Sequence, residues 1–266
     1  MPSPPSASPR DLLDLADRAA EAAAALLAEG LDRPRTSVST KTTATDLVTE
    51  MDRAAERLIT ETILAARPDD SLLGEEGSDR AGGSPVRWVI DPLDGTTNYV
   101  YRHPGFAVSI AAQVAGVTEV GVVVDVLGGH HYRAVRGDGA SRDGEPIAVS
   151  DRTDLAQALV ATGFGYDPAD RRHQGQVLAA VLGDIRDIRR MGSAALDLCS
   201  VASGRVDAYY ELTLAPWDWA AGALIAAEAG AVVCDLRGEP PSAGVVLAAP
   251  PALIGPLRDL LGRAGA

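Results

Sequence analysis

Apolar residues recur every three to four positions over residues 10–29, in the stretch DLLDLADRAAEAAAALLAE. This spacing and the high alanine content predict an amphipathic helix. The polar segment 36–46 has no apolar period and is expected to form a mobile connection or a short hairpin. A second helix is predicted to begin at Asp46, whose carboxylate can cap the first turn, and to end before Pro68.

The middle of the chain has the pattern of β-strands. Residues 86–90 are apolar and partly β-branched, which predicts a buried strand leading into the acidic turn that follows. Further strands are expected within residues 106–115, 120–127 and 131–137. The segment 137–146, GDGASRDGEP, is rich in turn residues and is a candidate boundary between two halves of the chain.

Beyond that boundary, helical and strand patterns alternate. Helices are expected near residues 171–182, 194–202, 218–229 and at the C-terminus, and strands at 185–188, 206–210, 231–234 and 244–249. Such alternation predicts an α/β (α+β) sandwich with layered sheets. We expect a disordered leader over residues 1–9, and halves over 10–140 and 141–266 that form one compact unit.

Charge and composition exclude some classes of protein. The formal net charge of −13 argues against a nucleic-acid binder, but acidic side chains that collect divalent cations can still hold an anionic substrate. No apolar run approaches the length of about 18 residues that a membrane span needs. Cys199 and Cys234 lie among apolar residues and are expected to be buried free thiols, compatible with a reducing cytoplasm.

The segment DPLDGTTN, residues 91–98, carries the most specific chemistry. Asp91 and Asp94 follow a predicted buried strand, where two carboxylates repel each other and are costly to desolvate without a cation. Hard oxygen ligands of this kind suit Mg²⁺. If a helical turn starts at Gly95 or Thr96, its amides point at an anion. Metal and phosphate sites are therefore predicted side by side, against the alternative of a simple turn.

Two other acidic segments are candidates for the same cavity. Glu75 and Glu76 follow the apolar residues SLL, a predicted short strand, although paired glutamates usually lie on a solvated surface. Asp218 heads an alanine-rich helix, where an aspartate most often serves as an N-cap. A tryptophan on each side of Asp218 makes an unusually apolar setting for a simple cap.

A third candidate lies near the start of the second predicted helix. Asp52 follows Asp46 by six residues, so it can face the core rather than water. A buried acid beside a hydroxyl group is a candidate for activating water. Lys41, the only lysine in the chain, precedes both.

Together these segments resemble the inositol monophosphatase family, within the larger group of lithium-sensitive, metal-dependent sugar phosphatases. The matching stretches are Lys41–Asp52, Gly74–Glu76, Asp91–Asn98, Gly192–Ala195 followed by LCSVASGRVDAYYE, and Trp217–Gly222. They stand in the family's order and cover most of the chain, from about Lys41 to Cys234.

The resemblance implies a layered αβαβα sandwich with two sheets and assigns roles by position. The implied ligands of two or three Mg²⁺ ions are Glu75, Asp91, the carbonyl of Leu93, Asp94 and Asp218. The implied substrate contacts are Asp94, Gly95, Thr96, Gly192, Ser193, Ala194, Glu211 and Asp218, with Gly95 and Thr96 holding the phosphate. The implied catalytic residues are Asp52, Thr96 and Glu75, and Lys41 lies on an implied mobile loop.

The implied function is Mg²⁺-dependent hydrolysis of myo-inositol monophosphate, or of a closely related polyol phosphate, by direct attack of a metal-activated water. Such chemistry depends on charge stabilisation and positioning, which a carboxylate and metal site can supply. A cytoplasmic homodimer inhibited by Li⁺ is also implied, with no nucleic-acid or membrane partner.

Other functions remain open. The same kind of site could serve histidinol phosphate, fructose 1,6-bisphosphate or a nucleotide 3′-phosphate, although Thr97 stands where a histidinol-phosphate enzyme is expected to carry arginine. A regulator that binds RNA or a transcription partner is a further alternative, which the acidic balance opposes. Arg102 and Pro216 depart from the family pattern and could alter specificity or be neutral.

Overall fold

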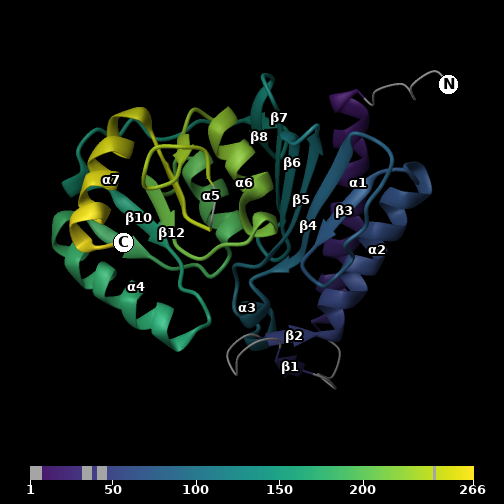
Figure 1. Ribbon diagram of the computed structural model, residues 1–266, viewed down its shortest axis with the longest axis horizontal. Helices are drawn as coiled ribbons and strands as arrows, with labels where there is room; N and C mark the ends of the chain where they lie inside the picture. The colour runs from purple at the N-terminus through teal and green to yellow at the C-terminus, as the bar shows by residue number, and fades with distance from the viewer. Residues whose placement is uncertain (1–7, 32–37, 41–46, 242–243) are drawn as a thin grey trace.

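Three layers of helices alternate with the two larger β-sheets (Figure 1). The computed structural model describes residues 8–31, 38–40, 47–241 and 244–266. Within these residues, no helix has both the length and the apolar character needed to cross a membrane.

The larger sheet has seven strands in sequence order. They are β3 (Ser71–Gly74), β4 (Val86–Asp94), β5 (Ala107–Val114), β6 (Val117–Asp125), β7 (His130–Val135), β8 (Gly139–Arg142) and β9 (Glu145–Pro146). Only the β3–β4 pair is parallel. The predicted strand at 86–90 thus continues to Asp94, and the turn-rich segment 137–146 contributes β8 and β9 to this sheet.

The smaller sheet has five strands in the order β11-β10-β12-β14-β13. They are β10 (Leu159–Thr162), β11 (Asp187–Arg189), β12 (Ala208–Glu211), β13 (Val232–Cys234) and β14 (Val246–Ala249). The sequence pattern predicted each of these except β10, with bounds that differ from the observed ones by up to two residues. In β10 the four residues LVAT are too short to show a strand period, so tertiary pairing decides their conformation.

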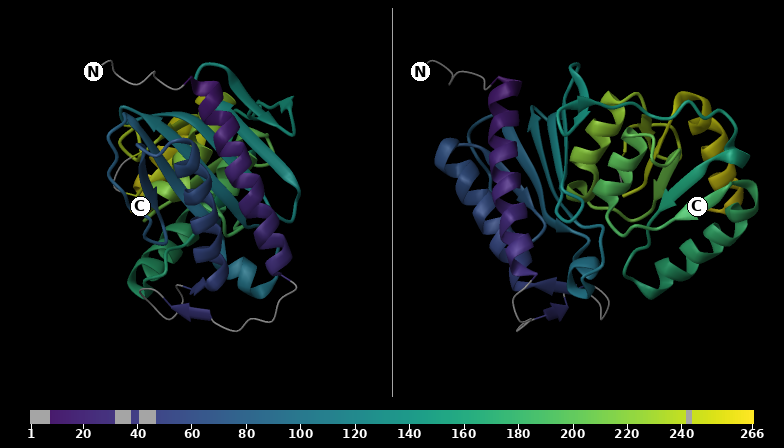
Figure 2. Two further views of the ribbon diagram at one scale, coloured as in Figure 1. Left: turned by 90° about the vertical axis from the view of Figure 1, so that its right-hand side faces the viewer. Right: turned by 180° about the vertical axis from the view of Figure 1, so that it is seen from behind.

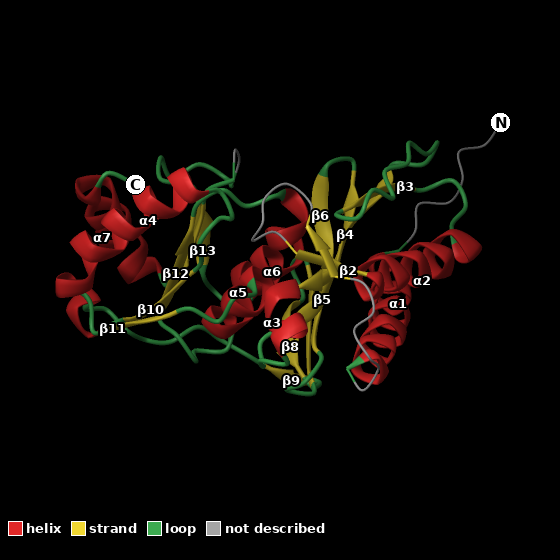
Figure 3. Ribbon diagram, turned by 90° about the horizontal axis from the view of Figure 1, so that it is seen from below, coloured by secondary structure: helices red, strands yellow, loops and turns green. Residues whose placement is uncertain are grey.

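The helices form an outer, a middle and a second outer layer (Figures 2 and 3). They are α1 (Pro9–Gly30), α2 (Glu50–Ala66), α3 (Thr96–Tyr101), α4 (Pro168–Val181), α5 (Ala194–Ala202), α6 (Pro216–Glu228) and α7 (Pro251–Ala264), with 3-10 turns η1 (Leu155–Gln157) and η2 (Leu182–Asp184). Helices α1 and α2 cover the larger sheet, α5 and α6 lie between the sheets, and α4 and α7 cover the smaller sheet. The expected αβαβα sandwich is confirmed.

The start of the second helix differs from the prediction. Helix α2 begins at Glu50, because the preceding residues form β2 (Leu47–Thr49), which pairs antiparallel with β1 (Val38–Thr40). The predicted helix start at Asp46 was therefore wrong; a pair of antiparallel strands does form here, but its second strand lies beyond the segment 36–46 in which a hairpin was one of the two expectations. Backbone pairing of two segments that contain β-branched residues prevails over helix initiation here.

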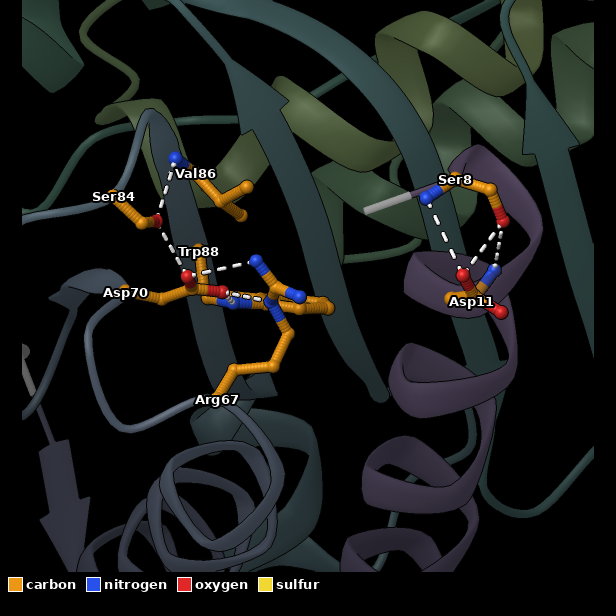
Figure 4. A network of polar contacts seen from close by, with 7 residues as sticks. All are labelled: Ser8, Asp11, Arg67, Asp70, Ser84, Val86 and Trp88. Atoms are coloured by element: carbon orange, nitrogen blue, oxygen red, sulfur yellow. Dashed lines mark hydrogen bonds and ion pairs between the residues drawn. The ribbon is translucent and has the colours of Figure 1, made fainter. Parts of the chain in front are cut away.

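A buried carboxylate beside the edge strand β3 is fully paired. Asp70 is 1% exposed and accepts hydrogen bonds from Trp88 Nε1 at 2.9 Å, Ser84 Oγ at 2.5 Å and the guanidinium of Arg67 (Figure 4). Pairing of this kind offsets the cost of removing a carboxylate from water. The same figure shows Ser8 Oγ accepting a hydrogen bond from the amide of Asp11, which caps α1.

The middle layer depends on small residues because α6 closely approaches both α5 and the larger sheet. A Cβ added at Gly222 in α6 would lie 2.9 Å from Leu198 Cβ in α5. A Cβ added at Gly121 in β6 would lie 2.7 Å from the carbonyl oxygen of Ala221. The helix α6 therefore fits between α5 and the larger sheet only with glycine at these two contacts.

We expect Gly222→Ala to lower the free energy of unfolding by about 1–3 kcal/mol, because the added methyl overpacks the contact between α5 and α6. Gly175→Ala in α4 is a matched control, since its added Cβ meets no atom within 4 Å. That control should be neutral or stabilising by up to about 1 kcal/mol. Chemical denaturation measures both, and equal effects would contradict the packing argument.

Candidate active site

A β-bulge brings the two aspartates of the DPLD segment to one face of the larger sheet. Asp91 pairs with Ser109 and Asp94 with Ala107, so three steps along β4 oppose two steps along β5. Side chains alternate between faces along a strand, and residues three apart would otherwise point to opposite faces. The extra residue restores a common face. A hydrogen bond of 3.0 Å from Leu93 N to Asp91 Oδ1 closes the turn between them.

Helix α3 begins immediately after this bulge. Gly95 is its N-cap residue and has a φ of 95°, and an added Cβ would lie 2.8 Å from the carbonyl oxygen of Gly105. Glycine is therefore required both by the left-handed backbone and by the close approach of a neighbouring segment. A helical turn does start where the sequence analysis placed one, while phosphate binding by Gly95 and Thr96 stays a prediction.

Asp52 and Thr96, 44 residues apart in sequence, meet in the interior. Thr96 Oγ1 lies 2.9 Å from Asp52 Oδ1, to which it donates, and 3.2 Å from the carbonyl oxygen of Leu93. Asp52 is fully buried on α2. The expectation that Asp52 faces the core is confirmed, and the structure brings together the two residues expected to act as a pair.

Glu75 enters the same region from the end of β3. The amide of Glu75 donates to the carbonyl oxygen of Ile90 at 3.2 Å, which holds Glu75 beside the second half of β4. Because β3 and β4 are parallel, both deliver their acidic residues at the same edge of the sheet. Glu75, which was expected to project toward the same cavity as the other acidic residues, therefore lies near Asp91. Burial is the largest cause that raises the pKa of Asp91, and the charge of Glu75 is the second largest.

Helix α6 supplies Asp218 from its first turn. The helix begins at Pro216, and Asp218 is its third residue rather than its N-cap as the simple alternative proposed. The carboxylate of Asp218 accepts a hydrogen bond from Ala215 N at 2.6 Å. Asp218 therefore accepts a hydrogen bond from a free amide at the start of the helix, and it is also one of the acidic side chains gathered at this site, here called the carboxylate cluster: Glu75, Asp91, Asp94 and Asp218.

The first turn of α5 holds Asp94. Ser193 Oγ donates to Asp94 Oδ2 at 2.6 Å, and Ala195 N donates to the same oxygen at 2.7 Å. Ser193 is also the N-cap of α5, since its Oγ accepts a hydrogen bond from Leu196 N at 3.2 Å. The larger sheet and the middle helical layer are therefore joined at the site by one carboxylate.

Glu211 closes the site from the smaller sheet. Tyr209 OH donates to Glu211 Oε2 at 2.8 Å, and a Cβ added at Gly163 would collide with that oxygen. The glycine after β10 therefore makes room for the Glu211 carboxylate.

A cavity of about 480 Å³ lies beside Asp94, Glu211 and Asp218. Six expected substrate contacts line it: Asp94, Gly192, Ser193, Ala194, Glu211 and Asp218. The lining also includes residues that the sequence analysis missed, namely Gly163–Asp167, Asp170, Arg190, Thr213 and Leu214. The other expected site residues within the described chain, Asp52, Glu75, Asp91, Leu93, Gly95 and Thr96, do not line this cavity. The Gly-Phe-Gly sequence after an unrecognised strand was the one signal that could have found the missed loop.

Burial and mutual repulsion raise the pKa of several carboxylates at this centre. Burial raises the pKa of Asp94 to about 6 and that of Glu211 to about 7. Burial, followed by the charges of acidic neighbours, holds the pKa of Asp91 and of Asp218 well above the ordinary range. Asp197, not considered at the sequence level, is 1% exposed, and its pKa is raised by burial and then by Glu211.

The donor set fits a hard divalent cation. Glu75, Asp91, Asp94 and Asp218 offer carboxylate oxygens whose mutual repulsion a cation would relieve, and oxygen donors are what Mg²⁺ prefers. Among the described residues no group of three acidic, histidine or cysteine side chains forms a preformed metal-ligand cluster, so the fit rests on donor chemistry and charge.

Other sequence expectations can be located. Lys41 and Asp46 lie outside the described residues. Arg102 is exposed at the end of α3, and Pro216 occupies the first position of α6. Cys199 and Cys234 are buried free thiols, as predicted.

Buried carboxylates gathered beside a polar cavity, within five alternating layers, fit a hydrolase of phosphate esters. More narrowly, the chain belongs to the inositol monophosphatase family, whose model matches residues 8–261. The family and phosphatase activity expected from the sequence are thereby confirmed.

Named relatives agree with this assignment. The chain is 46% identical over 238 residues to inositol-1-monophosphatase of Mycobacterium leprae, covering 85% of this chain and 82% of that one. It is 41% identical over 229 residues to Nus factor SuhB of Escherichia coli strain K12, covering 85% and 86%. Among solved structures, Mycobacterium tuberculosis SuhB has a TM-score of 0.83 at 42% identity, covering 97% of this chain and 98% of that one. The extragenic suppressor protein SuhB of Bartonella henselae reaches 0.88 at 35%, covering 96% and 98%.

In the metal-free protein, we expect Glu211→Gln to reduce the loss of Tm that accompanies a rise in pH from about 5 to about 7.5. Folded protein keeps the Glu211 proton up to its pKa of about 7, whereas the unfolded chain releases it near its ordinary value of about 4.3. Stability linked to this proton is complete below the unfolded pKa and is lost as pH rises through the folded one.

Calorimetry in the presence of a chelator measures this effect, with the exposed Glu145→Gln as control. Parallel Tm-against-pH curves for Glu211→Gln and the unmodified protein would contradict the assigned pKa.

Proposed function

We propose that this phosphatase hydrolyses myo-inositol monophosphate, or a closely related polyol phosphate, to the alcohol and inorganic phosphate. The observation that carries the proposal is the cavity in which Asp94, Ser193 and Glu211 face one space beside the carboxylate cluster. Carboxylates and a hydroxyl suit the many hydroxyl groups of a polyol, because each can accept or exchange a hydrogen bond with them. The name of the Mycobacterium leprae relative supports the same substrate.

The lining favours a monophosphate over a bisphosphate. Of the described residues around the cavity, Arg190 is the only arginine or lysine, whereas five are acidic: Asp94, Asp167, Asp170, Glu211 and Asp218. A second phosphate on the substrate would meet mostly like charge, with Arg190 as the one cation to offset it. Thr97, rather than arginine, likewise supports inositol phosphate over histidinol phosphate.

The catalytic cofactor in this proposal is Mg²⁺, in two or three ions. Glu75, Asp91, Asp94, Asp218 and the carbonyl of Leu93 would hold it. Bound Mg²⁺ would neutralise these carboxylates and the phosphate and would make water more acidic.

The residues Asp52 and Thr96 would handle the proton of the attacking water. The hydroxyl of Thr96 already donates to Asp52, so its oxygen can accept a hydrogen bond from water while Asp52 receives a proton. Water attack forms the new P–O bond as the ester P–O bond breaks, the leaving alkoxide takes a proton from solvent to become the alcohol, and Asp52 returns its proton to solvent. Glu75 would orient the same water. No phosphorylated enzyme is formed.

A transcription-related role is the second candidate, since relatives 41–44% identical are named Nus factor SuhB. The net charge of −13 opposes direct RNA contact, so a protein partner is the favoured route. Family membership also supports a homodimer and inhibition by Li⁺, and the buried free thiols are compatible with a cytoplasmic location.

We expect Asp91→Asn to lower kcat/KM for inositol monophosphate by at least about 100-fold, because changes outside the direct ligand shell already reach that loss. Steady-state assays over a Mg²⁺ titration measure it. Exposed Asp79→Asn on the loop after β3 is the control and should leave activity unchanged. Activity of Asp91→Asn equal to that of the unmodified protein would remove the proposed site.

A panel of phosphate esters assayed with Mg²⁺ tests the substrate. We expect inositol monophosphate to give a kcat/KM above those of histidinol phosphate, fructose 1,6-bisphosphate and a nucleotide 3′-phosphate. In Glu211→Gln, the KM for inositol monophosphate should rise more than kcat falls, because Glu211 would bind substrate hydroxyls rather than react. Preference for one of the other esters would overturn the substrate assignment, and an acid-stable phosphoprotein would overturn direct water attack.

A further inference from the structure

Helix α2 presents a second buried carboxylate one turn beyond Asp52. Glu56 follows Asp52 by four residues, which places both on the same face of the helix. Asp52 is fully buried and Glu56 is 4% exposed. Helix α2 packs against β4, and Glu56 lies next to Gly74 at the end of β3, just before Glu75. The reaction proposed above uses Asp52 and leaves Glu56 without a role.

Both oxygens of Glu56 bind the backbone of the loop that follows Glu75. Glu56 Oε2 accepts a hydrogen bond from Glu76 N at 2.8 Å, and Glu56 Oε1 accepts one from Ser78 N at 3.0 Å. The sequence separations are 20 and 22 residues. Hydrogen bonds to an ionised acceptor are stronger than neutral ones, and two of them fix orientation as well as distance.

The loop is built around this carboxylate. A Cβ added at Gly74 would lie 2.5 Å from Glu56 Oε2 and would collide with Ser78 Oγ, so only glycine allows the approach. Gly77, between the two bound amides, has a φ of 100° and turns the chain there. Burial raises the pKa of Glu56, because removing its carboxylate from water costs free energy. The chain has a carboxylate at this buried position despite that cost.

Glu75 is consequently anchored on both sides. Its own amide donates to the carbonyl oxygen of Ile90 in β4, and the next amide along, that of Glu76, donates to Glu56. The backbone of Glu75 is therefore held between β4 and α2. Since α2 also carries Asp52, one rigid helix sets the positions of both Glu75 and the Asp52–Thr96 pair.

We propose that Glu56 is a positioning residue that fixes Glu75 for divalent-cation binding and keeps it in register with Asp52 and Thr96. The inference rests on the proposed function, because it takes Glu75 as a cation ligand. If Glu56 had a purely structural role, substituting it would alter stability alone. If Glu56 positions Glu75, substituting it also lowers the affinity for Mg²⁺.

The test compares Glu56→Gln with Glu61→Gln, an exposed change on the same helix that removes the same charge. In E56Q an NH₂ group replaces one acceptor oxygen and faces a backbone N–H, so one of the two hydrogen bonds is lost. We expect hydrogen exchange of the Glu76 and Ser78 amides in metal-free E56Q to be at least about 10-fold faster, and Mg²⁺ affinity measured by calorimetry to fall about 10- to 100-fold. E61Q should match the unmodified protein in both.

A double-mutant cycle with Glu75→Gln distinguishes the positioning of Glu75 from a general loss of rigidity around the site. If Glu56 acts through Glu75, E56Q weakens Mg²⁺ binding in the natural background and has little further effect once Glu75 is changed. Additive losses, or unchanged Mg²⁺ affinity in E56Q despite faster exchange, would overturn the inference while leaving the proposed function intact. If E56Q fails to fold, Glu56→Asp replaces it in both measurements, because it keeps the charge on a shorter side chain. Faster exchange with unaltered Mg²⁺ affinity in this variant would contradict positioning.

Failure of the proposed function has a different signature. Unmodified protein that binds no Mg²⁺, or Glu75→Gln that binds it normally, would show that Glu75 is not a ligand, whatever Glu56 does to the loop. Exchange at Glu76 and Ser78 should be unaltered by E75Q, because the bonds to Glu56 involve the backbone of the following residues.

Discussion

Repulsion among buried carboxylates is the constraint on which this molecule is organised. Asp91, Asp94 and Asp218 come from separate positions in the chain, and burial raises the pKa of each. Folding alone gives no reason to bring such groups together, because each loses hydration and gains a like-charged neighbour. The arrangement becomes favourable when a divalent cation supplies the missing charge. Much of the surrounding structure serves to hold these groups in place until then.

The two sheets and the helical layer between them all contribute to this centre. The larger sheet delivers Asp91 and Asp94, the middle helices hold Asp94 and carry Asp218, and the smaller sheet supplies Glu211. The contributions therefore come from both sheets and from the helices between them. The close helix packing that glycine permits in the middle layer also helps to set the separation of these carboxylates.

Local pattern was enough to predict much of this. The helix at 194–202 was located at its observed bounds by its apolar run, and the acidic segment at 91–98 stood out because its residue types have few structural uses together. The β-hairpin start of α2, the strand β10 and the additional lining of the cavity were missed because long-range pairing, rather than local period, decides them. Glu56 and Asp197 gave no signal, since nothing in a sequence distinguishes a buried acidic residue on a helix from a solvated one.

The bulge in β4 limits how this protein can change. It makes the spacing between Asp91 and Asp94 a matter of parity: one residue more or fewer turns one carboxylate to the far side of the sheet. Side chains within the segment can be exchanged one at a time, each at a graded cost. Adding or removing a residue reverses the orientation of a side chain completely. This short segment therefore does not tolerate insertions or deletions, whereas the loops around it do.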